Sequence, residues 1–292
     1  MEETFKRWRA EDRSYYVETT LPFAANDRNG HLKPAEVFRL FMEIAGDDFG
    51  ERGLSHKYMM DRGYYFILTR AQVHFASDIP DTARVTLRTW PYKTRSLQVY
   101  RGYEMRDADG ALVACGTGVF MIIGPEGKPI RMSDFPFLSW DDAFCDAPVE
   151  YESKGRIRAK GDLAELGTVR ASFNDLDRNG HVNNARYLAY AQDCLPVELQ
   201  NRHITDVAIV YDAETREGAD LHVRCDASAC ANDRLQPGED GWVSVYGQGE
   251  NGEPSFGCRF RFADAEAPRA AKAANRRWRW TDTKRNSRPG RC

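Results

Sequence analysis

Three polar side chains of different chemistry stand at alternate positions in one short string of the sequence. Asp177, Asn179 and His181 offer a carboxylate, an amide and an imidazole within F-N-D-L-D-R-N-G-H-V-N-N-A-R-Y. If that stretch is extended, residues two apart share one face, and the three groups point into the same space. A carboxylate and an imidazole held together can move protons in general acid–base catalysis. The string therefore predicts a catalytic site.

A helix is expected to begin directly after this string. Asn183 and Asn184 are residue types that favour helix N-caps, and apolar residues then recur with the spacing of one helix face. These apolar residues are Tyr187, Leu188, Ala191, Cys194 and Leu195. The first turn of a helix has N–H groups without helical partners and a partial positive charge. Such a helix start can stabilise an oxyanion that forms when a carbonyl group is attacked.

A repeat indicates which elements position these groups. Asp-Arg-Asn-Gly-His occurs at 27–31 and again 150 residues later at 177–181, and each copy precedes an apolar helix pattern. Further along, the offset falls to 136, so that Val73 corresponds to Ile209, and the first copy has 14 more residues within 50–65. Strand-like stretches follow, at 84–90, 96–106 and 111–123 in the first copy and at 219–227, 241–248 and 255–262 in the second. The sequence therefore predicts an α+β protein made of two copies of one fold.

Two other interpretations of the string need to be weighed. The stretch 175–180 matches the first ligand positions of an EF-hand calcium loop, but Arg186 stands where the bidentate Glu is required. The first copy has Glu36 at that place and Ala25 at the first ligand position, so neither copy has the full set and no metal is expected. Asp, Asn and Gly are also turn formers, so a plain turn before a capped helix is the structural alternative.

The segment from Ser172 to Asp193 resembles the signature D-L-D-x-N-x-H-V-N-N-x-x-Y of acyl–acyl carrier protein (acyl-ACP) thioesterases, the plant plastid type and its bacterial relatives. The resemblance extends over about residues 14–263, including Thr89–Pro91 and Arg101–Glu104. It implies two tandem hotdog domains, each a long helix wrapped by a curved antiparallel sheet. We expect the N-terminal domain at 14–135, a linker at 136–164, the catalytic domain at 165–264 and a basic tail at 265–292.

The same resemblance implies the site and the reaction. Its catalytic residues correspond to Asp177, Asn179, His181 and, in the string Tyr211-Asp-Ala-Glu-Thr215, to Glu214. The expected reaction is hydrolysis of fatty acyl-ACP to free fatty acid, with no cofactor and with acyl carrier protein as the partner. Thr215 replaces the family's usual Cys, so a papain-like triad does not apply at this position, and Cys225 lies ten residues further on.

The first copy keeps part of the same pattern. Asp27, Asn29 and His31 are present, and Asp78 stands at the position that corresponds to Glu214. However, Pro34 occupies the place of Asn184, and proline has no N–H to donate. We therefore expect the second copy to be the working site.

Several alternatives stay open on the sequence alone. An acyl-CoA thioesterase or a non-catalytic acyl-binding protein could share this fold. Aromatic and apolar residues of the first half could line an acyl tunnel or form plain core; they are Tyr64, Tyr65, Phe66, Ile67, Trp90 and Phe120. Acyl carrier protein is acidic, and basic residues that could dock it are Arg88, Lys93, Arg95 and Arg101.

Composition narrows the class of protein. Lys+Arg 41 against Asp+Glu 44 gives a net charge of −3, so no overall basic field favours nucleic acid, and no nucleic-acid partner is expected. No apolar run approaches the ~18 residues of a membrane span, and no leader is evident, so a cytoplasmic location is expected.

The seven cysteines are interpreted as free, buried thiols. The basic tail is expected to be disordered, although it would suit an anionic contact, and a homodimer is left open.

Overall fold

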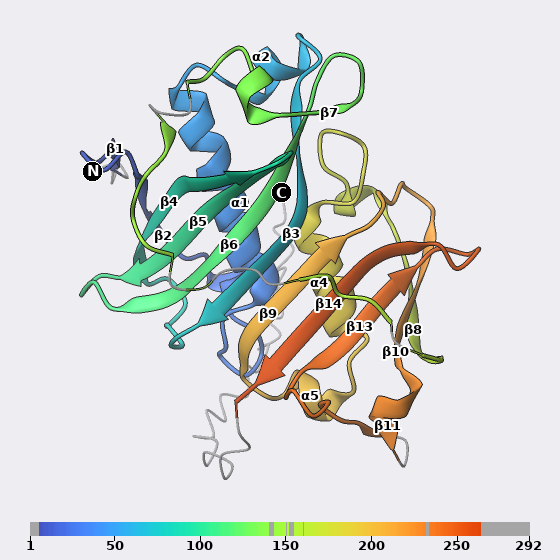
Figure 1. Ribbon diagram of the computed structural model, residues 1–292. Helices are drawn as coiled ribbons and strands as arrows, with labels where there is room; N and C mark the ends of the chain where they lie inside the picture. The colour runs from blue at the N-terminus through green and yellow to red at the C-terminus, as the bar shows by residue number, and fades with distance from the viewer. Residues whose placement is uncertain are drawn as a thin grey trace, which may run out of the picture.

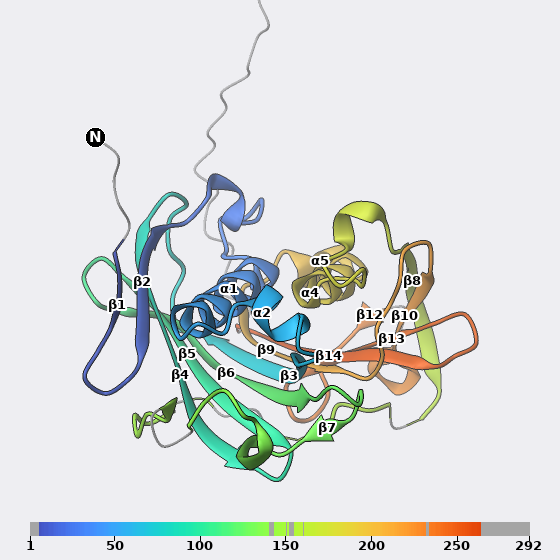
Figure 2. The same cartoon turned by 90° about the horizontal axis from the view of Figure 1, so that it is seen from above.

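The computed structural model describes residues 6–139, 143–149, 151, 155–159, 161–231 and 234–263 (Figure 1). The expected basic tail at 265–292 lies outside these residues. One large antiparallel sheet runs through both halves of the chain, and the main helices all cover one of its faces (Figures 1 and 2). The α+β class predicted from the sequence is confirmed.

The first half forms one end of this sheet. Its strands follow the order β1-β2-β4-β5-β6-β3, and β7 pairs with β6. The strands are β1 (Arg7–Arg9), β2 (Tyr15–Thr20), β3 (Tyr65–Phe75), β4 (Arg84–Arg95), β5 (Gln98–Asp107), β6 (Leu112–Ile123) and β7 (Pro129–Ile130). The helices are η1 (Phe23–Ala25), α1 (Pro34–Glu51), α2 (His56–Met60) and η2 (Met132–Asp134).

The second half continues the sheet in the order β9-β14-β13-β10-β8, with β11 and β12 as a separate pair. Its strands are β8 (Leu163–Arg170), β9 (Ile204–Tyr211), β10 (Asp220–Asp226), β11 (Cys230–Ala231), β12 (Arg234–Leu235), β13 (Val243–Gln248) and β14 (Pro254–Phe262). Its helices are η3 (Phe173–Asp175), α4 (Asn184–Asp193), α5 (Val197–Gln200) and η4 (Ala227–Ala229). β8 begins at Leu163, inside the stretch 136–164 that the sequence assigned to the linker.

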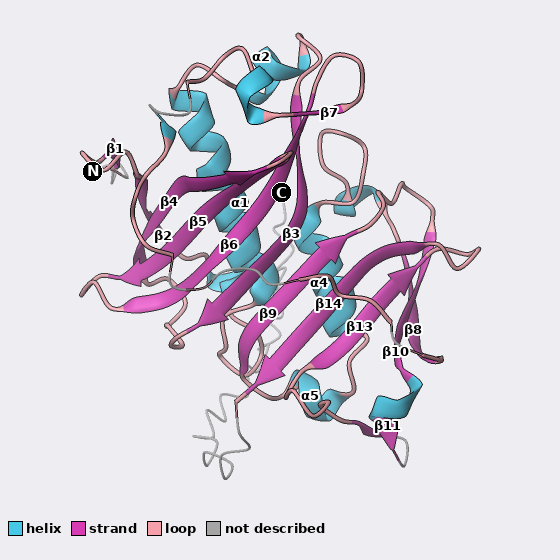
Figure 3. Cartoon of the chain, viewed as in Figure 1, coloured by secondary structure: helices cyan, strands magenta, loops and turns pink. Residues whose placement is uncertain are grey.

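The two halves join where β3 pairs with β9. Gln72 lies opposite Ala208 in that pairing, and the two residues are 136 positions apart, which equals the offset of the repeat over these strands. The two copies are therefore related by an approximate two-fold axis that passes between these strands. On the covered face of the sheet, α1 packs against α4, as the views in Figures 2 and 3 show.

The two central helices begin at equivalent positions and differ in length. α1 starts at Pro34 and α4 at Asn184, which are 150 residues apart, but α1 has 18 residues and α4 has 10. The additional residues of the first copy extend α1 as far as Glu51, so they begin before the expected stretch 50–65. A short helix follows in both copies, α2 in the first and α5 in the second. Each helix buries residues of the predicted apolar face, which are Val37, Phe38, Phe41, Ile44 and Ala45 in α1 and Tyr187, Leu188 and Ala191 in α4. Leu195 is buried just beyond α4, and Cys194 is only partly buried.

One candidate for docking an acidic carrier is wrong. Arg101 is only 2% exposed, and its guanidinium lies 2.7 Å from the Asp48 carboxylate, so it is not on the surface. Burial on its own would raise the pKa of Asp48, but Arg101, Arg52 and Arg9 around it hold that pKa below its usual range. Lys93 and Arg95 are exposed at the end of β4, whereas Arg88 is partly buried between Asp12 and Glu104.

The six described cysteines are free thiols, of which Cys115, Cys145, Cys225 and Cys258 are buried and Cys194 and Cys230 are partly buried. Cys292 lies outside the described residues. Within the described part of the chain, no helix has the length and apolar character that crossing a membrane requires.

Candidate active site

The loop that carries the chemical groups is a tight turn rather than an extended segment. The backbone N–H of Asp177 donates to the carbonyl of His181 at 2.9 Å, and the N–H of Gly180 donates back to Asp177 at 3.1 Å. Oδ1 of Asp177 accepts the N–H of Asn179 at 2.8 Å. Gly180 adopts φ +76°, a left-handed conformation that suits glycine. The expected extended geometry is therefore wrong, because Asp, Asn and Gly form the turn that their types favour.

The turn nevertheless brings His181 to an acidic partner. Nε2 of His181 lies 3.1 Å from Oε2 of Glu214, which is in the loop after β9. A backbone bond of 2.9 Å from the N–H of Val182 to the carbonyl of Thr215 fixes the two loops side by side. The imidazole side chain is 21% exposed and the carboxylate side chain is 59% exposed, so both groups are open to water.

Tyr187 on α4 contacts the loop that carries Glu214. Its hydroxyl accepts the backbone N–H of Thr215 at 3.0 Å, and Oγ1 of Thr215 lies 2.9 Å from Oγ of Ser255. Burial raises the pKa of Tyr187, so its hydroxyl stays protonated at neutral pH. The final Tyr of the string therefore positions the loop that carries Glu214.

Backbone hydrogen bonds occupy most of the N–H groups at the start of α4. Asn183 caps the helix by accepting the N–H of Ala185 at 3.0 Å. The N–H groups of Val182, Asn183 and Arg186 also have acceptors within 2.9 Å. Among the bonds between described residues, only the N–H of Asn184 in the stretch 182–186 has no acceptor. That group is therefore the one available to a negatively charged oxygen at this helix start.

An apolar cavity from the first domain ends at the same loop. Its volume is about 260 Å³, and Asn179 is the one residue of the second domain in its lining within the part of the chain that the structure describes. The lining residues are Met42, Ala45, Gly46, Phe49, Leu54, His56, Met59, Met60, Tyr64, Tyr65, Phe66, Arg101, Phe120 and Asn179. Oδ1 of Asn179 lies 3.3 Å from Nε2 of His56 on α2, so the cavity and the loop 177–181 meet in a direct contact.

The equivalent loop of the first copy has a different environment. Asp27 accepts the N–H groups of Asn29 at 2.8 Å and of His31 at 3.0 Å, so the same turn is present. However, α1 begins with Pro34, and the amide of Asn29 contacts Asn201 of the other domain. The first copy therefore lacks the backbone donor that Asn184 supplies in the second.

Two models of known protein domains match the chain. Residues 12–134 match the acyl-ACP thioesterase N-terminal domain, and residues 161–264 match the acyl-ACP thioesterase C-terminal domain. The chain belongs to the acyl-ACP thioesterase family.

Curated relatives of this family member come from plants. It is 22% identical over 210 residues to a chloroplastic acyl-[acyl-carrier-protein] hydrolase of Cuphea viscosissima, covering 70% of this chain and 48% of that protein. It is 23% identical over 212 residues to a chloroplastic palmitoyl-acyl carrier protein thioesterase of Cuphea hookeriana, with the same coverage of 70% and 48%. The chain thus spans about half the length of the curated relatives that it matches.

Solved structures show that this family member has the double-hotdog fold. An acyl-ACP thioesterase from Bacteroides thetaiotaomicron superposes with a TM-score of 0.74 at 23% identity, covering 86% of this chain and 98% of that one. A 12:0-ACP thioesterase from Umbellularia californica superposes with a TM-score of 0.70 at 14% identity, covering 86% and 97%. The two tandem hotdog domains predicted from the sequence are confirmed.

The six aromatic and apolar residues that could line a tunnel or form core do not all have the same surroundings in the acyl-ACP thioesterase N-terminal domain. Tyr64, Tyr65, Phe66 and Phe120 line the cavity, but Ile67 and Trp90 do not. Trp90 is 1% exposed and packs so closely on Gly102 that a Cβ there would meet its ring at 2.7 Å. Trp90 is therefore core, whereas Ile67 is only partly buried and belongs to neither group. An acyl tunnel stays a prediction for the four residues that line the cavity.

Calcium binding by the string and nucleophilic attack by Cys225 both meet obstacles in this family member. Asp175, the first residue of the calcium-loop pattern, is held by Arg186 at 2.6 Å and by the N–H of Ser172 at 2.9 Å, so a calcium ion would have to displace both. Burial raises the pKa of Cys225 to about 12, which keeps its thiol protonated and unsuited to attack. The residues that sequence reasoning missed are His56 and Tyr187, which contribute contacts from separate elements.

Proposed function

We propose that this chain hydrolyses fatty acyl-ACP, adding water to the thioester carbonyl and releasing a free fatty acid and the carrier thiol. The observation that supports the proposal is the contact between Asn179 and His56, because both residues line the same apolar cavity. An aliphatic chain buried in that cavity loses contact with water, which is favourable by about 0.8 kcal/mol per CH₂ group. The polar thioester is then left at the loop that holds Asp177, Asn179 and His181.

The site offers a carboxylate on each side of His181 along the chain. Glu214 is paired with His181 and is exposed, so it can take a proton from an attacking water molecule. Asp177 has one oxygen engaged by the N–H of Asn179, and its other oxygen lies 3.5 Å from the amide of Asn179. That second oxygen is available to orient water or to attack the carbonyl and form a mixed anhydride. The N–H of Asn184 would stabilise the oxyanion in either route.

A single turnover in ¹⁸O-labelled water distinguishes these routes. Water activation puts the label only into the released fatty acid. Attack by a carboxylate puts the label into Asp177 or Glu214 when water then adds to the enzyme carbonyl of the anhydride, and mass spectrometry of the digested protein identifies which residue carries it. Label in either residue therefore excludes simple water activation.

The choice of carrier is tested with matched substrates. Acyl-ACP and acyl-CoA thioesters of equal chain length should differ by at least tenfold in kcat/KM in favour of the carrier protein. Equal values would favour the acyl-CoA thioesterase alternative, and binding of the acyl group without turnover would favour the non-catalytic alternative. Lys93 and Arg95, both exposed at the end of β4, are the remaining basic candidates for docking the acidic carrier.

The other expectations from the sequence stay predictions. A cytoplasmic location is checked by cell fractionation. A homodimer is checked by light scattering on the purified chain.

A further inference from the structure

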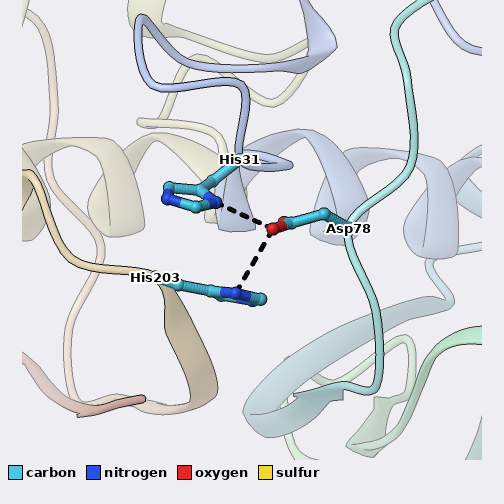
Figure 4. A group of neighbouring side chains, drawn as sticks. All are labelled: His31, Asp78 and His203. Carbon is cyan, nitrogen blue, oxygen red and sulfur yellow. Dashed lines mark hydrogen bonds and ion pairs between the residues drawn. The ribbon is translucent and has the colours of Figure 1, made fainter. Parts of the chain in front are cut away.

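The first domain has its own histidine–acid pair, and a histidine of the second domain joins it. Nδ1 of His31 lies 2.9 Å from Oδ2 of Asp78, which corresponds to the pairing of His181 with Glu214 in the second copy. Nδ1 of His203, in the connection between α5 and β9, lies 3.3 Å from the same oxygen. Figure 4 shows both rings directed at the Asp78 carboxylate from two different parts of the chain.

We propose that His31, Asp78 and His203 bind one divalent transition-metal ion of the zinc class at the junction of the two hotdog domains. Their three ligand atoms lie within 4.8 Å of one another. A tetrahedral zinc ion with bonds of about 2.0–2.2 Å spaces its ligand atoms by about 3.3 Å. The two distances to Asp78 already lie near that value, and small rotations of the imidazole rings would bring the two nitrogens together.

The surrounding backbone holds the ligands in place before any metal binds. Asp27 accepts the N–H of His31 at 3.0 Å, and Asn26 donates to the carbonyl of Ile79 at 2.8 Å, which fixes the loop of Asp78. Arg28 donates to Asn201 at 3.0 Å, close to His203 along the chain. Contacts across the domain junction therefore keep the ligands together, as a preorganised metal site requires.

The ligand types determine which ion would bind. Two imidazole nitrogens and one carboxylate oxygen suit Zn²⁺, Co²⁺ or Ni²⁺, whereas Mg²⁺ and Ca²⁺ prefer oxygen ligands alone. Three protein ligands leave a fourth position for water, and the ligand side chains are 25–35% exposed, so water can reach it. Metal binding at Nδ1 requires each neutral imidazole to carry its single proton on Nε2 instead.

The proposed ion would join the domains rather than take part in hydrolysis. None of its three ligands lines the apolar cavity, and none contacts Asp177, Asn179, His181 or Glu214 in the described structure. Because the ligands come from both domains, a bound ion would stabilise the folded pair by mass action. The proposal does not rest on the proposed function.

The test uses the full chain after treatment with a chelator and dialysis. Titration with Co²⁺ should give one ion per chain, with visible d–d absorption and without the thiolate charge-transfer band that cysteine ligands would produce. Zn²⁺ should displace the Co²⁺ and should raise the thermal unfolding midpoint, while Mg²⁺ should do neither. A thiolate band, or no saturable binding, would overturn the proposal.

Three variants assign the site. Asp78→Asn keeps a hydrogen-bonding group but removes the anionic ligand, and His203→Gln removes the ligand from the second domain. Each should weaken Co²⁺ binding at least tenfold and abolish the Zn²⁺-dependent rise in the unfolding midpoint. His222→Ala is the matched control, because His222 lies 3.1 Å from Glu165 in a comparable pair on β10 and β8. Equal Co²⁺ affinity in all variants would overturn the proposal. Each ligand variant tests the site separately, so one of them is enough if the other fails to fold.

Discussion

Nε2 of His56 lies 3.3 Å from Oδ1 of Asn179, and this contact joins the cavity of one domain to the loop 177–181 of the other. His56 opens α2, the short helix that follows α1 as α5 follows α4 in the second copy. Asn179 is otherwise an exposed residue in a turn. The first domain therefore contributes a polar partner to the site in the second.

His56→Ala is expected to lower kcat about tenfold. The change removes one hydrogen bond to the amide of Asn179, and such a bond contributes about 1–1.5 kcal/mol, which corresponds to about a tenfold change in rate. Steady-state kinetics with acyl-ACP measures the effect. His56→Gln should recover part of the activity, since its amide can still donate. Lys57→Ala, at the exposed next position on α2, should have no effect, and an unchanged kcat for His56→Ala would contradict the role.

Asp177→Asn is expected to reduce hydrolysis by about 10²–10⁴-fold, the range associated with loss of a general acid–base group. Asn keeps an oxygen that can accept the N–H of Asn179, so the turn should persist and the loss should report on the carboxylate. Asp27→Asn is the matched control, because Asp27 forms the same turn in the first copy. It should retain most of the activity, and the reverse pattern would assign catalysis to the first domain.

Much of the fold could be predicted because the sequence repeats. The offset of 150 placed the helix starts at Pro34 and Asn184, and the offset of 136 corresponds to the direct pairing of Gln72 with Ala208. Residues separated by a constant offset occupy equivalent positions in the two copies, because both copies bury the same faces of their helices and strands. The pairing of His181 with Glu214 also agrees with the positions that the family resemblance implied.

The remaining features depend on contacts between distant parts of the chain. His56 and Asn179 are separated by 123 residues, and no local spacing connects them. Arg101 carries a charge that usually lies at the surface, but Asp48, 53 residues earlier, neutralises it inside the protein. His203 reaches Asp78 only because the two domains share one sheet. Residue types alone do not specify such pairings.

Met59→Ala is expected to shift the preference toward longer acyl chains. Met59 is 4% exposed and lines the cavity, so truncation adds volume there at a cost of about 2–5 kcal/mol of stability. The measurement is kcat/KM across a series of acyl-ACP chain lengths. Met132→Ala is a suitable control, because Met132 is 6% exposed in the same apolar cluster but does not line the cavity. A shift of equal size in both variants would mean that general loosening of the core, rather than cavity shape, sets the preference.

Asp206 is expected to make stability fall at acid pH. It is 4% exposed, and its carboxylate accepts from Tyr151 at 2.6 Å and lies 2.9 Å from His74. Burial alone would raise its pKa, but these contacts, together with Thr205, lower the pKa below the usual value. Because the pKa of Asp206 is lower in the folded state than in the unfolded state, its charge stabilises the folded protein at pH values above the unfolded-state pKa of about 3.9. This contribution is lost as pH falls from there through the lower folded-state pKa.

Urea unfolding at a series of pH values measures this contribution. Asp206→Asn should be less stable than the parent by about 1–3 kcal/mol near pH 7, and the difference should shrink as pH falls below the unfolded-state pKa of about 3.9 and through the lower pKa of folded Asp206. Asp109→Asn, at an exposed turn, should follow the parent curve. A difference that is constant with pH would show that the charge of Asp206 does not contribute.

The role of the helix start can be tested with a substitution that the first copy already contains. Asn184→Pro removes the one N–H in 182–186 that has no acceptor among the described residues, and Pro34 shows that a helix of this fold can begin with proline. Asn183 has φ −60° and ψ 139°, close to the φ −67° and ψ 127° of Lys33 before Pro34, so the preceding residue already has the conformation that proline requires. The fold should therefore tolerate the change.

If the N–H of Asn184 stabilises the oxyanion, Asn184→Pro should lower kcat by about 10²–10³-fold, the usual cost of removing one oxyanion donor. KM should change little, because the charge develops only in the transition state. Asn184→Ala keeps the N–H and should keep most of the activity, which separates the backbone from the side chain. Circular dichroism and the unfolding midpoint verify that Asn184→Pro is folded. Full activity in a folded Asn184→Pro variant would place the oxyanion donor elsewhere, and Pro34 could then no longer account for a silent first copy.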